Sequence, residues 1–227
     1  MIWALHGAFG DASDWDGLAA ELDCDIRSID LWSPEHDLSL AEWGRVFNRT
    51  VSDADSEPVL LGYSMGARLG LHALIQEDSP WKAAILASPQ PGIPPDERHA
   101  RRESDDRWLQ RFDQLEWSAF WEAWNAQPVF ESAAARRRHE KRDGMRRGLD
   151  LWSIAEQRDL LPELHRITCP VAWVTGGRDP KYSRIAKATV PQLLNAQHLV
   201  VDGAGHRMPW DAAEEFRNLV RNVVESL

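Results

Sequence analysis

Six short apolar runs, alternating with helical patterns, constrain this 227-residue chain more than any other feature. Each run ends at glycine, proline or serine, which are typical turn residues. Runs that are apolar throughout, such as 59–61 and 83–87, indicate parallel strands buried on both faces. The pattern predicts an α/β fold with a mostly parallel sheet of about six strands, flanked by helices. Strands are expected at 2–5, 25–29, 58–61, 83–87, 171–175 and 198–201, and helices at 15–22, 40–51, 67–76, after Lys181, and at 211–224.

The alternation stops between residues 91 and 161, where helical patterns rich in Arg, Glu and Trp replace the strands. We predict that residues 1–90 and 162–227 form the core and that residues 91–161 form a helical cap. A cap inserted there would cover the carboxyl ends of the strands, where open α/β sheets bind ligands. A separate helical domain is disfavoured, because a stretch of about 70 residues buries little apolar surface alone.

The charge balance excludes several classes of partner. A net charge of −10 disfavours nucleic-acid binding and attachment to an anionic membrane. No apolar run approaches the roughly 18 residues of a membrane span, and the first residues lack the basic region of a signal peptide.

Neither H-E-x-x-H, C-x-x-C nor a glycine-rich nucleotide loop occurs, so we expect no metal and no cofactor. We expect a cytoplasmic protein, a monomer or weak homodimer, with Cys24 and Cys169 as free thiols.

One pentapeptide has the pattern of a nucleophile elbow. Residues 62–66 read Gly-Tyr-Ser-Met-Gly, directly after the apolar run 59–61 and directly before a helical pattern. In G-x-S-x-G the serine occupies a sharp strand-to-helix turn, and the glycines leave room for a tight backbone. Ser64 is therefore the candidate nucleophile or base.

A serine hydroxyl needs a histidine to take its proton and a carboxylate to orient that histidine. Asp179 follows the 171–175 strand and His206 follows the last strand, in the chain order that a nucleophile elbow requires. Asp202 is the second candidate acid, but we expect it on the strand itself. The oxyanion hole would consist of the backbone N–H groups of Ala8 and Met65.

Four motifs together make the chain resemble the α/β-hydrolase superfamily over nearly its whole length. These are His-Gly near the start, Gly-Tyr-Ser-Met-Gly-Ala-Arg, Gly-Gly-Arg-Asp-Pro-Lys-Tyr and Gly-Ala-Gly-His. The resemblance implies an α/β-hydrolase fold with Ser64, Asp179 and His206 as the catalytic triad. Two positions depart from the usual pattern: the loop after Asp30 reads Leu-Trp-Ser-Pro-Glu-His, and Ala67 replaces a glycine.

The cap region resembles one family more narrowly. Its segments Pro-Gly-Ile at 91–93, Glu-Arg-His-Ala-Arg-Arg at 97–102, Asp-Arg-Trp at 106–108 and Trp-Asn-Ala-Gln-Pro-Val-Phe at 124–130 are similar to the 2-succinyl-6-hydroxy-2,4-cyclohexadiene-1-carboxylate synthases of menaquinone biosynthesis. That resemblance implies a lyase whose triad abstracts a proton, so that pyruvate is eliminated from a small polycarboxylate. It also places Tyr63, Arg68, Arg101, Trp124 and one of Arg136–Arg138 at the substrate.

Arginine suits such a substrate, because its planar guanidinium matches a carboxylate bidentately. The alternative for each arginine of the cap is a solvated helix face that pairs with Glu103, Asp105 or Asp113. We favour that alternative for Arg102 and Arg107, and a substrate contact for Arg68 and Arg101. Two other functions stay open: a serine hydrolase of small esters, thioesters or C–C bonds, and a non-catalytic hapten receptor. The intact Ser-Asp-His set disfavours the receptor.

Overall fold

The structure is a computed structural model that describes residues 1–33, 38–130 and 141–227. Among these residues, six strands form one sheet in the order β2-β1-β3-β4-β5-β6, and every pairing is parallel. This confirms the predicted α/β fold with its six-stranded sheet. The strands are β1 (Ile2–Leu5), β2 (Ile26–Ile29), β3 (Val59–Tyr63), β4 (Ala83–Ala87), β5 (Val171–Gly176) and β6 (Ala196–Val201).

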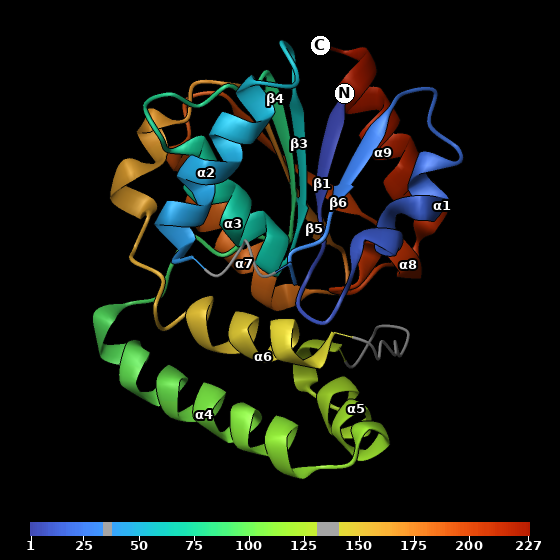
Figure 1. Ribbon diagram of the computed structural model, residues 1–227. Helices are drawn as coiled ribbons and strands as arrows, with labels where there is room; N and C mark the ends of the chain where they lie inside the picture. Colours follow the sequence, from blue (N-terminus) through green and yellow to red (C-terminus); the bar gives the residue numbers. More distant parts are fainter. Residues whose placement is uncertain (34–37, 131–140) are drawn as a thin grey trace.

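Helices cover both faces of the sheet (Figure 1). Helices α2 (Leu40–Ser52), α3 (Met65–Leu74) and α7 (Pro180–Thr189) lie on one face, and α1 (Asp16–Ala19), α8 (Met208–Asp211) and α9 (Ala213–Glu225) lie on the other. Because successive strand residues point to opposite faces, each central strand supplies two separate cores. In β1, Trp3 and Leu5 pack with α2 and α3, whereas Ile2 and Ala4 pack on the side of α9.

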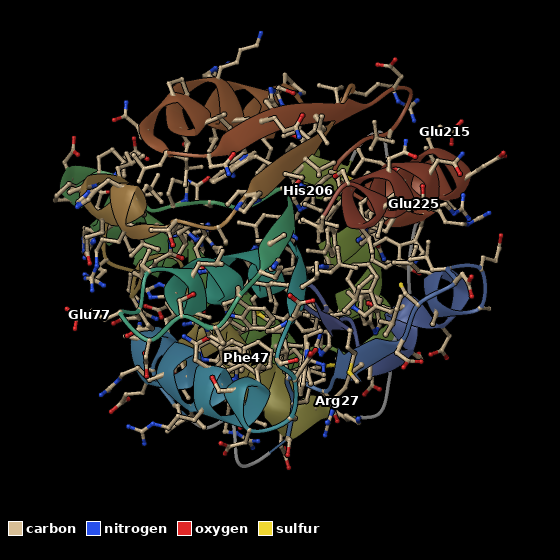
Figure 2. The ribbon with its side chains drawn as sticks, turned by 90° about the horizontal axis from the view of Figure 1, so that it is seen from above. Arg27, Phe47, Glu77, His206, Glu215 and Glu225 are labelled. Carbon is tan, nitrogen blue, oxygen red and sulfur yellow. The ribbon has the colours of Figure 1, made fainter. Side chains whose placement is uncertain are left out.

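The helices turn apolar side chains toward the sheet and charged side chains toward solvent. Helix α2 begins at a capping box formed by Ser39 and Glu42, and it buries Trp43 and Phe47 against the sheet. Seen from above, Phe47 lies inside the molecule, whereas Glu77 and Glu215 point outward at its rim (Figure 2). The amphipathic helices therefore bury their apolar stripe against the sheet and turn their charges to solvent.

Two of the predicted helices are wrong in extent. The segment 15–22 contains a single helical turn, α1, after a short 3-10 helix at Ala12–Trp15. The chain must turn there to enter β2 at Ile26, so the apolar pair Trp15 and Leu22 is buried without a continuous helix. The segment 211–224 is divided into α8 and α9 at Ala212, whose φ of −142° and ψ of 64° are not helical.

Helices α4 (Arg98–Gln114), α5 (Trp117–Asn125) and α6 (Arg142–Leu151) lie together beyond the carboxyl ends of the strands, with α6 nearest the sheet (Figure 1). The described part of 91–161 contains no strand. Edge-on aromatic rings join α4 to α5: the ring centre of Phe112 lies 5.0 Å from that of Phe120 and 5.4 Å from that of Trp117. Such aromatic pairs stabilise small helical layers beyond the area that they bury.

Both cysteine thiols, Cys24 and Cys169, are free, as predicted. Across 1–33, 38–130 and 141–227, no helix combines the length and the apolar character that crossing a membrane requires.

Candidate active site

Ser64 occupies a strained turn between β3 and α3. Its φ of 52° and ψ of −109° lie in a region that residues with a side chain rarely adopt. The two glycines explain how the turn closes. A Cβ on Gly66 would lie 2.5 Å from the carbonyl oxygens of Leu5 and His6, and one on Gly62 would lie 2.7 Å from Cα of Ala67. Only glycine allows this approach, so the pentapeptide presents the Ser64 hydroxyl beyond the end of the sheet.

The structure brings the three predicted residues Ser64, His206 and Asp179 into one chain of hydrogen bonds. His206 Nε2 lies 3.1 Å from Ser64 Oγ, and His206 Nδ1 lies 2.9 Å from Asp179 Oδ2. Asp179 also caps α7, because its Oδ1 accepts a hydrogen bond from the Tyr182 N–H at 3.1 Å. The cap fixes the carboxylate, which in turn fixes the ring of His206.

Burial decides the charge of His206. Loss of solvent lowers its pKa below the usual 6.5, although the hydrogen bond and the negative charge of Asp179 oppose that shift. The imidazole is therefore neutral at neutral pH. With Asp179 accepting from Nδ1–H, Nε2 carries a lone pair and accepts the proton of the Ser64 hydroxyl.

Ala8 and Met65, the predicted oxyanion residues, line the same cavity as Ser64. Met65 is the first residue of α3, where backbone N–H groups and the helix dipole favour negative charge. Ala8 lies in the turn after β1, which is held by the Gly10 N–H donating to Gly7 O at 3.0 Å. The neighbouring Phe9 adopts a φ of 58°.

His6 fixes the start of this turn. Its Nδ1 lies 2.8 Å from Gly7 O, and its Nε2 accepts from the Leu31 N–H at 3.0 Å. Burial lowers the pKa of His6. A neutral ring with the proton on Nδ1 satisfies both contacts, so His6 joins β1 to the loop after β2 and does no chemistry of its own.

A cavity of about 240 Å³ opens in front of Ser64 and His206, between the carboxyl ends of the strands and the helices α4, α5 and α6. Its apolar wall is aromatic. Trp124, one of the predicted substrate contacts, lies 4.4 Å from Phe9 and 4.9 Å from Trp108, ring centre to ring centre. Tyr63, another predicted contact, packs 5.6 Å from His206. The described aromatic residues of the wall are Phe9, Tyr63, Trp108, Trp121, Trp124, Phe130, Trp152, Tyr182 and Trp210.

Cationic side chains line the other part of the cavity. Arg68 and Arg101, both predicted, contribute from α3 and α4. Lys181 and Arg207 also line it and were missed by the sequence reasoning. Their positions carried a signal: Lys181 follows the candidate acid by two residues, and Arg207 follows the candidate base directly. The residues Arg136–Arg138 lie outside the described part of the chain.

Arg102 and the second candidate acid, Asp202, both lie away from the cavity. Arg102 pairs with Asp150 and Glu156, away from the cavity, which matches the solvated role expected for it. Asp202 does not lie on the last strand, contrary to expectation. Strand β6 ends at Val201, and Asp202 is exposed in the turn that follows. Asp179, by contrast, is buried against His206.

Comparison with known proteins identifies the family of this chain. Residues 4–219 match the alpha/beta hydrolase family. Similar relatives include proteins of Enterobacter sp. (strain 638), 29% identical over 219 residues, and of Salmonella arizonae, 29% identical over 221 residues. The first alignment covers 89% of this chain and 83% of the relative, and the second covers 87% of each. Both relatives are named 2-succinyl-6-hydroxy-2,4-cyclohexadiene-1-carboxylate synthase.

Solved structures show the same fold. MenH from S. aureus matches with a TM-score of 0.91 at 22% identity, covering 99% of this chain and 93% of that one. A thermophilic esterase from Thermogutta terrifontis matches with a TM-score of 0.76 at 18% identity, covering 99% and 89%. At such identities the likeness extends to the fold alone.

Proposed function

This chain belongs to the alpha/beta hydrolase family, and we propose that it is a lyase that eliminates pyruvate from a succinylated enolpyruvyl-cyclohexene dicarboxylate. The names of its relatives support this reaction at 28–29% identity. One observation carries the proposal beyond the names: the Ser64–His206 pair opens into a cavity whose walls include Arg68 and Arg101. A base beside fixed cations suits proton abstraction from a polycarboxylate.

The proposed reaction needs three contributions from these residues. Ser64 Oγ takes a proton from a substrate carbon while its own hydroxyl proton passes to His206 Nε2, and Asp179 stabilises the imidazolium. The electron pair of the broken C–H bond forms a C=C bond and expels the enolpyruvyl oxygen. His206 Nε2 then returns a proton to the methylene carbon of the leaving enolate, which departs as pyruvate and leaves the imidazole neutral again. The elimination is redox-neutral, and atoms balance between one substrate and two products.

The cations act on binding and on charge. Guanidinium groups hold the substrate carboxylates in one orientation, which converts proton transfer into a step between fixed partners. The backbone N–H groups of Ala8 and Met65 would stabilise the negative charge that develops on a substrate oxygen as the proton leaves. Tyr63 and Trp124 would contact the ring of the substrate.

The test is pyruvate release from the succinylated enolpyruvyl-cyclohexene substrate, comparing the wild type with Ser64→Ala. We expect rapid release by the wild type and a loss of at least about 10³-fold in the variant. Ser226→Ala, at the exposed end of α9, is the matched control and should retain full activity. A folded wild type that releases no pyruvate above the spontaneous rate would refute the lyase.

A serine hydrolase of small esters, thioesters or C–C bonds is the second candidate. The observation that favours it is the same hydrogen-bonded Ser64, at the N-terminus of α3, which acyl transfer also requires. A hydrolase would release a burst of p-nitrophenol from p-nitrophenyl acetate, equal to the enzyme concentration. The lyase is expected to show no burst, because the cations of the cavity find no carboxylate on this ester.

A further inference from the structure

The two cavity arginines come from different layers of the molecule. Arg68 lies on α3, beside the sheet. Arg101 lies on α4, in the layer of helices beyond the carboxyl ends of the strands. Each guanidinium is held by groups other than the candidate triad. Arg68 donates to Gln157 Oε1 at 3.0 Å and to the carbonyl oxygen of Trp152 at 2.5 Å. Arg101 donates through Nε to both carboxylate oxygens of Asp105 at 2.9 Å.

The groups that hold them are buried and connected. Gln157 is fully buried, and its Nε2 donates to Gln90 O at 2.7 Å, which fixes the amide so that Oε1 faces Arg68. Asp105 is 6% exposed, and it also accepts a hydrogen bond from the hydroxyl of Ser153. The Ser153 oxygen in turn accepts from the Ala155 N–H at 3.0 Å. The short segment 152–157 therefore contacts both Arg68 and the Asp105 carboxylate that holds Arg101.

These contacts leave donors for a ligand. Arginine has five N–H groups. Hydrogen bonds within the described residues use two of those on Arg68, and on Arg101 only Nε–H. The Nη groups of Arg101, and the rest of Arg68, are therefore left for carboxylates in the cavity that both side chains line.

The electrostatics agree with a positioning role. Burial and, next, repulsion from Arg101 lower the pKa of Arg68 to about 10, although Tyr182 and Asp105 oppose the shift. Two cations that repel each other spread apart unless something restrains them. Asp105 and Gln157 supply that restraint, one as a buried counter-charge and the other as a neutral acceptor.

We propose that Asp105 and Gln157 are positioning residues for carboxylate binding, Asp105 acting through Arg101 and Gln157 acting through Arg68. The proposal rests on the proposed function, since that function makes the ligand a polycarboxylate. Segment 152–157 is the shared support, because it supplies Gln157, the Trp152 carbonyl and the Ser153 hydroxyl. The substrate therefore meets two guanidinium groups whose orientation is set before it binds, which lowers the entropic cost of ordering these side chains on binding.

The test is a pair of double-mutant cycles with two readouts: KM and kcat for pyruvate release, and calorimetric binding of succinate as a simple dicarboxylate. We expect Asp105→Asn to weaken succinate binding and to raise KM by about fivefold, with kcat changed less than about twofold. In an Arg101→Ala background the same substitution should change neither by more than about twofold. Gln157→Leu should behave in the same way, with its effect abolished by Arg68→Ala.

Asp150→Asn is the control for Asp105→Asn, because Asp150 pairs with Arg102 outside the cavity. Both KM and succinate binding should be unchanged in it. If Asp105→Asn does not fold, Ser153→Ala removes one donor to the same carboxylate and should raise KM in the wild-type background alone. Equal effects of Asp105→Asn with and without Arg101, or a fall in kcat at constant KM, would overturn the positioning role.

The two readouts separate this proposal from the proposed function. A wild type that binds succinate, with the predicted coupling, but releases no pyruvate would refute the lyase and leave the positioning role supported. A wild type that releases pyruvate but shows no coupling in either cycle would refute the positioning role alone. If no saturable succinate binding occurs, the carboxylate-binding assignment fails, and the positioning proposal fails with it.

Discussion

Ser64 and His206 are 142 positions apart in the chain, yet Ser64 Oγ lies 3.1 Å from His206 Nε2. Ser64 is placed by the turn that ends β3, and His206 by the loop that follows β6 at the edge of the same sheet. All strands run parallel, so their carboxyl ends meet on one side and supply the site together.

The acid of this site is expected to be Asp179 and not Asp202. Asp179→Asn keeps the size of the side chain but removes the charge that holds His206 in the correct tautomer, and should lower kcat by about 10⁴-fold. Asp202→Asn, in the exposed turn after β6, is the matched control and should leave kcat unchanged. Steady-state pyruvate release measures both. A larger loss in the Asp202 variant would place the acid there.

Two neighbouring arginines should differ sharply in function. Arg101 lines the cavity, whereas Arg102 pairs with Asp150 and Glu156 outside it. Arg101→Ala is expected to lower kcat/KM by at least about tenfold through loss of a charged hydrogen bond. Arg102→Ala should change kcat/KM by less than about twofold. Similar losses in both variants would show that the net positive charge matters, and not the contact.

The pH dependence should follow the neutral form of His206. Burial lowers the pKa of this group below 6.5, so the imidazole is unprotonated at neutral pH. We expect kcat/KM to be constant near neutrality and to fall about tenfold per unit on an acid limb whose midpoint lies below pH 6.5. A pH series of kcat/KM checks this. An acid limb centred above pH 7 would contradict the role of burial.

Gly66 should tolerate no side chain. A Cβ there would lie 2.5 Å from the backbone oxygens of Leu5 and His6, at the end of β1, which cannot move without disturbing the sheet. We expect Gly66→Ala to lower the free energy of unfolding by about 3 kcal/mol, measured by urea denaturation. Gly17→Ala, in α1, meets nothing within 4 Å and should be neutral or stabilising by less than about 1 kcal/mol. Equal effects at the two glycines would refute the close packing.

His72 should make the protein acid-sensitive. Burial, the first cause, and the positive charges of Arg68 and Arg158 lower its pKa to about 3. Protonation therefore favours the unfolded chain, whose histidine titrates near pH 6.5, and the free energy of unfolding falls as the pH drops from 6.5 towards 3.

At about 1.4 kcal/mol per unit, His72 contributes a loss of about 2 kcal/mol between pH 7 and pH 5. His72→Gln should reduce the difference in unfolding free energy between these pH values by about that amount, as urea denaturation at both would measure. His165→Gln, on an exposed residue, is the control and should leave the difference unchanged. An unchanged difference in the His72 variant would mean that another group causes the acid sensitivity.

Local chemistry determined much of this protein directly from its sequence. The runs at β1, β3, β4 and β5 predicted parallel strands, because a strand buried on both faces needs mostly apolar side chains. The edge strands β2 and β6 are only partly buried and include polar residues. Gly62 and Gly66 marked the tight turn at Ser64, and the chain order marked Asp179 and His206. Helix extents at 15–22 and 211–224 were wrong, because the breaks depend on where the chain must enter β2 and on the backbone of Ala212.

Only the tertiary structure decided how cations are placed around the cavity. Arg101 and Arg102 are adjacent and alike in sequence, yet one lines the cavity and the other pairs outside it, because a helix turns successive side chains about 100° apart. Asp105 and Gln157 carry no motif at all. Asp105 lies four residues after Arg101 on α4, so their pairing is local, but its burial and its contact with Ser153 depend on tertiary packing. Gln157 reaches Arg68 across 89 residues, through packing that no local pattern records.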